Sequence, residues 1–282
     1  MDNDIIQKIK KSVGFIYKKT NDEFQVSGTG FFVSVKSERV PTKSHMYFVT
    51  AKHVLQKSNG ELNEIALRLN TFDDHSHLTI LSNDKLHFYT HKEDDVDIVV
   101  FPCRPNVKTY DYIPVNSDII STKDIIEKEK IKEGTNILFS GLFSNHVGTQ
   151  KNQPIVRFGK TSLISDEKIL WDVDDTPAKM VDLYLMECQS YGGNSGSPVF
   201  FDLERFNQTD KNQIKISNKI YLAGIMTGSF RHEIEIDTPE TINKIFSKHH
   251  IGISAVTPAY KLHEILFSKE LIKHRNKNDK EL

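Results

Sequence analysis

A serine lies between two glycines in residues 193–198, which read Gly-Asn-Ser-Gly-Ser-Pro. Gly193 and Gly196 have no Cβ, so they tolerate the backbone of a tight turn and let another main chain approach closely. In such a turn the N–H groups of Gly193 and Ser195 can point at one spot and hold a developing oxyanion. Ser195 is therefore a candidate nucleophile, if the chain supplies a base and a group that orients the base. Ser197 is a weaker alternative, because Gly193 stands two residues before Ser195 and provides the oxyanion donor there.

Two upstream blocks supply the missing groups. His53 ends an apolar run, and Asp97 opens another. The neighbouring Asp94 and Asp95 compete with Asp97, but only Asp97 leads directly into the apolar residues. The chain order is therefore His53, Asp97, Ser195. Three chain orders of this triad occur on unrelated folds, and this one belongs to the chymotrypsin-like double barrel.

Four blocks in this order resemble a trypsin-like serine protease, nearer to the bacterial HtrA-like branch than to the secreted digestive enzymes. The matching blocks are residues 28–33 (Gly-Thr-Gly-Phe-Phe-Val), 50–53 (Thr-Ala-Lys-His), 97–100 (Asp-Ile-Val-Val) and 193–198. With the strands between them, the resemblance spans residues 13–266. It implies that His53 is the general base, that Asp97 orients its imidazole, and that Ser195 is the nucleophile. The N–H groups of Gly193 and Ser195 would form the oxyanion hole.

The resemblance implies an all-β fold of two six-stranded antiparallel β-barrels, with helices at both ends of the chain. Short runs of alternating apolar residues predict the strands: 31–35, 44–50, 64–69, 77–81, 97–101, 134–142, 155–164, 182–186, 219–227 and 251–256. The expected order is an N-terminal helix (1–12), a first barrel (13–101), a connection (102–130), a second barrel (131–256), and a C-terminal helix and tail (257–282).

Helix signals refine the two ends and the connection. Asn3 is a plausible cap for the first helix, and residues 119–131 have the spacing of a solvated helix. Thr257 and Pro258 are typical of a helix start. The buried stripe of that last helix is expected to comprise Leu262, Ile265 and Leu266. The charged tail from residue 273 is expected to fray.

Composition limits the partners and the compartment. Among 282 residues, 37 are basic and 38 are acidic, so the formal net charge is −1. This balance does not favour a nucleic-acid partner. The N-terminus lacks the features of a signal peptide, and no apolar stretch is long enough to span a bilayer, so no membrane partner is expected. Cys103 and Cys188 are interpreted as buried free thiols in a reducing compartment. We therefore expect a cytoplasmic protein, without room for a PDZ module.

Asn194 departs from the trypsin-type pattern. Trypsin-type zymogens carry Asp before the nucleophile, and this Asp pairs with an N-terminal amine released by cleavage. An Asn side chain cannot form that ion pair, and no matching activation site precedes Gly28. Activation by this switch is therefore not expected. Two possibilities remain, an oxyanion loop that is preformed and one that a substrate or partner orders.

The substrate pocket is less determined. The resemblance implies substrate-binding roles for Gln189, Gly192, Gly224, Ile225, Met226 and Thr227, with Cys188 near the pocket. Gln189 lies six residues before Ser195, where an Asp would select Lys or Arg side chains. A neutral or apolar side chain before the scissile bond is therefore favoured. Residues 223–227 are expected to bind an extended peptide by strand addition.

No metal or other cofactor is expected. His75 and His77 have a spacing that metal ligands use, but no nearby cysteine or carboxylate set completes a site. They are more simply interpreted as ordinary histidines.

The resulting hypothesis is a serine endopeptidase that acts on a peptide or protein substrate through an acyl-enzyme. A free cytosolic protease is hazardous, so restricted substrates or a regulatory protein partner are expected, in a bacterial stress or phage-defence pathway. One alternative is a catalytically silent scaffold of the same fold that binds extended peptides. Another is an esterase that uses the same acyl chemistry.

Overall fold

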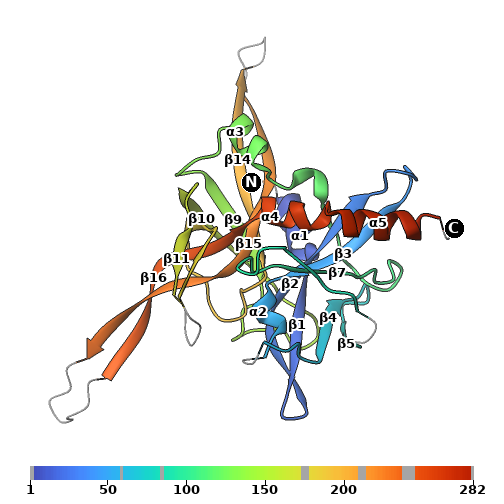
Figure 1. Cartoon of the computed structure of the whole chain (residues 1–282), viewed down its shortest axis with the longest axis horizontal. Coiled ribbons are helices and arrows are strands. Elements are labelled where there is room, and N and C mark those ends of the chain that lie inside the picture. Colours follow the sequence, from blue (N-terminus) through green and yellow to red (C-terminus); the bar gives the residue numbers. More distant parts are fainter. Residues whose placement is uncertain are drawn as a thin grey trace.

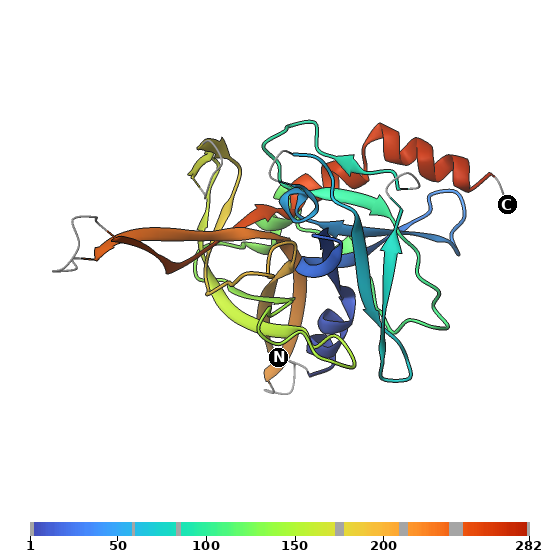
Figure 2. The ribbon, with the colours of Figure 1, turned by 90° about the horizontal axis from the view of Figure 1, so that it is seen from below.

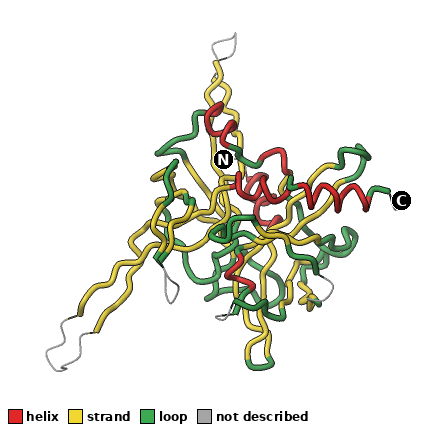
Figure 3. The backbone as a smooth tube through the Cα atoms, viewed as in Figure 1, coloured by secondary structure: helices red, strands yellow, loops and turns green. Residues whose placement is uncertain are grey.

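The structure is a computed structural model, and it describes residues 3–57, 60–82, 86–172, 178–208, 214–236 and 245–280. For residues 3, 204–208, 214–218, 231–236 and 245–250 only the backbone is described. Strands dominate, and helices lie near both ends of the chain (Figures 1 and 3). The expected all-β, chymotrypsin-like fold class is confirmed.

The first half of the chain forms one eight-stranded sheet. Its strands are β1 (Val13–Thr20), β2 (Glu23–Lys36), β3 (Ser44–Thr50), β4 (Ile65–Asn70), β5 (Ser76–Leu81), β6 (Tyr89–Thr90), β7 (Val99–Pro102) and β8 (Val115–Asn116). The order is β5-β4-β1-β2-β3-β7-β6, all antiparallel, with β8 added in parallel to β2.

This first sheet departs from the closed six-stranded barrel that the sequence led us to expect. The pairings among the described residues leave it open, with β5 and β6 at its edges. Most side chains of β5 are exposed, and β6 has only two residues. Neither edge strand thus has both the length and the buried face that closure of a barrel requires.

The second half forms the closed six-stranded barrel that was expected. Around the barrel the order is β10-β13-β16-β15-β14-β9. The strands are β9 (Asn136–Gly141), β10 (Ile155–Ile164), β13 (Tyr184–Glu187), β14 (Pro198–Gln208), β15 (Ile214–Ile236) and β16 (Ile245–Pro258). A separate two-stranded sheet comprises β11 (Ile169–Trp171) and β12 (Lys179–Val181).

Two barrel strands, β15 and β16, are longer than the sequence predicted, and β14 was not predicted. β14 and β15 pair from Pro198 out to Gln208, and β15 and β16 pair out to Ile236 and Ile245. These extensions project from the body as two hairpins (Figures 1 and 2). For β15 and β16, the apolar pattern marked the segments near the barrel core and not the extensions, because strand pairing beyond the core needs no buried face.

The two sheet units share a hydrophobic core. Phe31 and Val33 of β2 belong to the same buried cluster as Leu138 of β9, Phe200 of β14 and Leu222 of β15. This common core fixes the position of one unit against the other, and the segments that carry the predicted site meet at their junction.

The helices are α1 (Asn3–Ser12), α2 (Lys52–Leu55), η2 (Ser117–Ile119), α3 (Lys123–Glu129), α4 (Ala259–Leu266) and α5 (Lys269–Asn278). α3 is the predicted solvated helix, although it is shorter than expected. The predicted stripe of α4 is buried, with Leu262, Ile265 and Leu266 at most 3% exposed. The predicted Asn3 cap involves a side chain outside the described residues. No helix in the described ranges has the length and apolar character needed to cross a membrane.

Two predictions about the C-terminus are wrong. Pro258 itself is the N-cap of α4, because the hydroxyl of Thr257 instead contacts that of Thr227 at 2.7 Å. The tail does not fray at residue 273, since α5 continues to Asn278. Arg275 is buried and donates to the Leu266 carbonyl at 2.7 Å. The burial of Arg275 and its hydrogen bond stabilise the helix, although the charged composition of the tail had predicted fraying.

Candidate active site

His53 lies on α2, the short helix that follows β3. Val54 and Leu55 are buried, which fixes this turn against the first sheet. The imidazole is left 48% exposed. Asp97 lies just before β7, between the buried side chains of Val96 and Ile98. Because successive residues of an extended chain face opposite sides, Asp97 points away from that core and toward His53.

His53 and Asp97 form a paired contact. The His53 Nδ1 lies 2.6 Å from Asp97 Oδ2, and the His53 main-chain N–H donates to Asp97 Oδ1 at 3.1 Å. With Nδ1 hydrogen-bonded to the carboxylate, Nε2 is the nitrogen left to accept a proton. The pair therefore has the geometry of a base and its orienting group.

The two groups shift each other's pKa. Burial acts to lower the pKa of His53, but the charge and hydrogen bond of Asp97 outweigh it and raise that pKa above 6.5. Burial acts to raise the pKa of Asp97, but the charge and hydrogen bonds of His53 hold it below its usual value. The pair thus favours an ionised carboxylate beside an imidazole that protonates readily.

Ser195 reaches the same site from the second unit. It lines one cavity of about 810 Å³ together with His53 and Asp97. Its Oγ donates to the Thr227 carbonyl at 3.3 Å, and among the described residues it makes no hydrogen bond to His53. The structure therefore brings the three predicted residues to one cavity, with the serine turned toward β15.

A tight turn precedes Ser195. The Asn194 N–H donates to the Tyr191 carbonyl at 3.0 Å, with Gly192 and Gly193 as the central residues. Gly193 has φ +93°, which the second central residue of a type II turn requires. Within the described part of the chain, the N–H groups of Gly193 and Ser195 have no hydrogen-bond partner. Two main-chain donors are therefore available beside the serine.

The Asn194 side chain is buried, with 1% exposed. Its Oδ1 accepts from the Tyr191 N–H at 2.8 Å, and its Nδ2 donates to the Leu142 carbonyl at 2.6 Å. This uncharged side chain uses both a donor and an acceptor, which a carboxylate cannot do. A neutral amide thus occupies the position where the trypsin-type pattern has Asp.

The predicted substrate-binding residues divide into two groups. Gly192, Met226 and Thr227 line the cavity, whereas Gln189, Gly224 and Ile225 do not. Gly224 and Ile225 pair with β14 on one side and β16 on the other, so their main chains have no free edge to offer a peptide. Gln189 is exposed and accepts from the Tyr191 hydroxyl at 2.8 Å.

Several cavity residues were not predicted from sequence, namely Ser229, Trp171, Val181 and Leu183. Trp171 packs over Gly228, where a Cβ would lie 3.2 Å from the indole, and edge-on against Phe230 at 5.0 Å. The single tryptophan of the chain was a visible signal. Its place in the cavity depends on the β11–β12 sheet, which has no local motif.

The alternative carboxylates, Asp94 and Asp95, also line the cavity, but no hydrogen bond joins either side chain to His53 among the described residues. Asp95 pairs with Lys168 at 2.6 Å, and Asp94 has an exposed side chain. Ser197 is 0% exposed, so a substrate carbonyl has no access to its hydroxyl.

The remaining candidates also have other surroundings. Cys103 and Cys188 are free thiols; burial raises the pKa of Cys103 to about 12 and also raises that of Cys188. Cys188 packs in the barrel core and does not line the cavity. His75 contacts the Asp73 carbonyl, and His77 stacks edge-on with Tyr110. The described residues contain no cluster of metal-ligating side chains.

Comparisons with known proteins give similarity in structure only. No protein-family model matches the sequence, and no curated protein gives a significant match. The active form of the Rv3671c protease from M. tuberculosis is similar over 94% of this chain and 83% of its own, with 15% identity and a TM-score of 0.48. Its inactive form is similar over 94% and 91%, with 15% identity and a TM-score of 0.45. An inactive form with a serine-to-alanine substitution has 14% identity and a TM-score of 0.45, over 94% and 89%. At this level of similarity the comparison assigns no activity to this chain.

Proposed function

We propose that this chain is a serine endopeptidase. One observation carries the proposal: the hydrogen-bonded pair of His53 and Asp97 faces the same cavity as Ser195. In the turn at that serine, the N–H groups of Gly193 and Ser195 have no hydrogen-bond partner among the described residues. A base with its orienting carboxylate, a nucleophile and an oxyanion site are the parts that acyl transfer needs.

In the proposed reaction, Ser195 Oγ attacks the substrate carbonyl while His53 Nε2 takes its proton. Asp97 stabilises the imidazolium, and the N–H groups of Gly193 and Ser195 bind the oxyanion. His53 then protonates the leaving amine, and water hydrolyses the acyl-enzyme. For this step, Oγ must turn from the Thr227 carbonyl toward Nε2.

The edge of β15 favours a peptide over a simple ester. The main chain of β15 is hydrogen-bonded to the segment before β14 as far as Met226, whose N–H donates to the Ser197 carbonyl. Beyond it, β15 pairs only with β16 among the described strands, and Thr227 to Ser229 line the cavity. An extended peptide can add its main chain along this edge and place its carbonyl at Ser195.

Restricted substrate choice stays part of the proposal. Trp171, Val181 and Leu183 form an apolar wall of the cavity, and Ser190 adds a neutral hydroxyl. This apolar part of the lining favours peptides with neutral or apolar side chains near the scissile bond. Hydrolysis of casein with no preference among its peptide bonds would argue against restriction. The proposal also includes a regulatory protein partner, in a bacterial stress or phage-defence pathway, that controls the access of substrates to the cavity.

Fluorophosphonate labelling of the purified chain tests the proposal. We expect labelling that is lost in Ser195→Ala and His53→Ala and kept in Ser197→Ala, the neighbouring serine that is buried. Peptide turnover should fall by about 10⁶-fold in Ser195→Ala. Folded protein that never labels would support the alternative, a silent peptide-binding scaffold. A specific observation favours that alternative as the second candidate, namely the Ser195 hydroxyl turned toward Thr227.

A further inference from the structure

Thr29 of β2 holds the segment around Ser195 from the first sheet. It is 0% exposed. Its main-chain N–H donates to the Ser195 carbonyl at 2.9 Å, and its Oγ1 donates to the Gly193 carbonyl at 2.8 Å. The Leu142 N–H donates to the same Oγ1 at 2.9 Å. One buried hydroxyl therefore bonds the oxyanion turn and the end of β9 together.

Asn194 makes the second link between the same two segments, through its bond to the Leu142 carbonyl. We call Thr29, Asn194 and Leu142 the oxyanion clamp. It fixes the carbonyl of Gly193, a residue that would otherwise rotate freely because it lacks a Cβ. The Gly193 carbonyl and the Asn194 N–H belong to one peptide unit, and both are hydrogen-bonded. Because that unit is held, Gly193, whose own N–H is a donor in the proposed reaction, has less freedom to rotate.

The segment that supplies Leu142 is itself anchored. It connects β9 to β10, and Arg68 of β4 donates to the carbonyls of Gly148 and Thr149 at 2.8 and 2.9 Å. Asn70 and Asn152 exchange hydrogen bonds of 2.7 and 3.1 Å.

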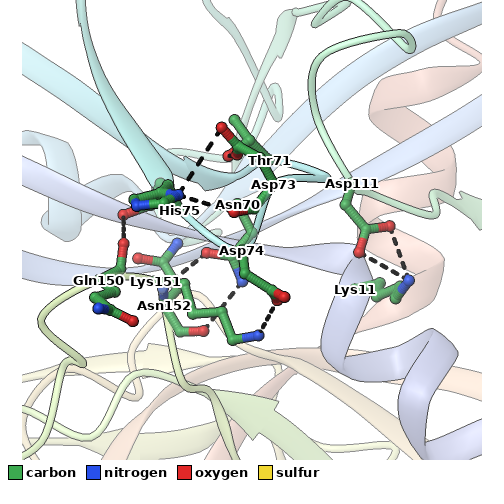
Figure 4. Close-up of polar contacts among 11 residues, drawn as sticks. Lys11, Asn70, Thr71, Asp73, Asp74, His75, Asp111, Gln150, Lys151 and Asn152 are labelled. Carbon is green, nitrogen blue, oxygen red and sulfur yellow. Dashed lines mark hydrogen bonds and ion pairs between the residues drawn. The ribbon is translucent and has the colours of Figure 1, made fainter.

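Figure 4 shows this anchor, with Asn70 and Asp74 facing Lys151 and Asn152. The Asn152 side chain also donates to the Arg68 carbonyl at 2.7 Å. The first sheet thus holds the connection at its middle as well as at Leu142.

We infer that the oxyanion clamp keeps the oxyanion hole assembled before substrate binds, so that neither a newly cleaved N-terminus nor a partner is needed to form it. Thr29 is a positioning residue, since it acts on the donors and does not itself reach the cavity. The contacts in the clamp are hydrogen bonds between uncharged groups, so no ion pair has to form. The inference rests on the proposed function.

Fluorophosphonate kinetics with a valine in place of threonine test the clamp. Thr29→Val keeps the side-chain shape but leaves the Gly193 carbonyl and Leu142 N–H unpaired. We expect the maximal labelling rate to fall about 100-fold, the scale of a small misplacement at a catalytic site, with the reagent's binding constant unchanged. Thr29→Ser should restore most of the rate, because it keeps the hydroxyl.

Thr161→Val is the matched control. Thr161 is equally buried in β10, and its hydroxyl has no hydrogen-bond partner among the described residues. The same chemical change there should leave the labelling rate unaltered. Equal rates in Thr29→Val and Thr161→Val would overturn the inference.

Asn194→Asp tests the other half of the clamp. A carboxylate cannot donate to the Leu142 carbonyl and would face it with a like partial charge. We expect labelling to fall at least as far as in Thr29→Val. Wild-type labelling in Asn194→Asp would contradict the clamp.

Hydrogen exchange separates failure of this inference from failure of the proposed function. The purified chain alone should protect residues 142–154 and 191–196, and Thr29→Val should raise exchange there. If the chain labels only after a partner or N-terminal cleavage is supplied, the proposed function stands and the inference fails. If the chain never labels, the proposed function fails. Independently of labelling, the clamp is overturned if hydrogen exchange in residues 142–154 and 191–196 is the same in Thr29→Val as in the wild type.

Discussion

At the scale of single residues, the pair of His53 and Asp97 predicts a pH dependence. His53 must be neutral to accept the serine proton, and Asp97 raises the pKa of His53 above 6.5. Fluorophosphonate labelling should therefore rise with pH through an apparent pKa above 6.5. The contribution of the His53–Asp97 ion pair to the free energy of unfolding changes in the opposite direction. It is fully present below the unfolded-state pKa of His53 and is lost as pH rises through the raised pKa of the folded state. A labelling rate that is half-maximal below pH 6.5 would contradict this assignment.

Asp97→Asn is the matching substitution. The amide removes the charge that raises the pKa of His53 and favours the wrong imidazole tautomer. Turnover should fall by about 10⁴-fold, the size of this effect in the serine protease triad. The apparent pKa of the remaining activity should move down. Asp94→Asn, at an exposed carboxylate nearby, should change neither property.

Gly196 provides a test of the close approach in the nucleophile loop. A Cβ there would lie 2.0 Å from the Thr29 carbonyl oxygen, and the residue has φ +85°. Gly196→Ala should therefore displace Ser195 and abolish labelling, with a lower midpoint in thermal unfolding. Gly134→Ala is the control, because that glycine also has a positive φ (+84°) but open space around it. Equal labelling in the two variants would contradict the close approach.

At the scale of elements, α5 is a structural helix and not a loose tail. Leu271 is 0% exposed in the shared core. Leu271→Ala should lower the free energy of unfolding by about 2–5 kcal/mol, as buried leucines commonly do. Lys273→Ala, at an exposed position of the same helix, should change it by less than about 0.5 kcal/mol. Denaturant unfolding measures both, and equal effects would mean that α5 is not packed on the core.

At the scale of the whole molecule, the site depends on two units at once. His53 and Asp97 come from segments next to strands of the first sheet, Ser195 comes from the segment before β14 of the barrel, and one buried cluster joins the two units. We expect thermal unfolding, followed by circular dichroism, to coincide with loss of fluorophosphonate labelling. Loss of labelling far below the unfolding transition would show that the units separate first.

The sequence was most informative where the pattern is local. The alternation of apolar residues located ten strands but missed β1, β6, β8, β11, β12 and β14. The turn chemistry of residues 193–198 singled out Ser195. The closed barrel and the stripe of α4 were also predictable. The strand ends were less so, because hairpins that extend beyond the core bury no periodic face.

The sequence alone determined the fold class and the three residues that share the cavity, because motif order and strand period are encoded by neighbours in the chain. Only the tertiary structure decided that the first sheet stays open, that Gly224 and Ile225 lie inside the barrel, and that Trp171 forms a cavity wall. The clamp is the clearest case, since Thr29 and Leu142 lie 113 residues apart. Such contacts depend on strand register and on how two sheets pack, and no local pattern carries that information.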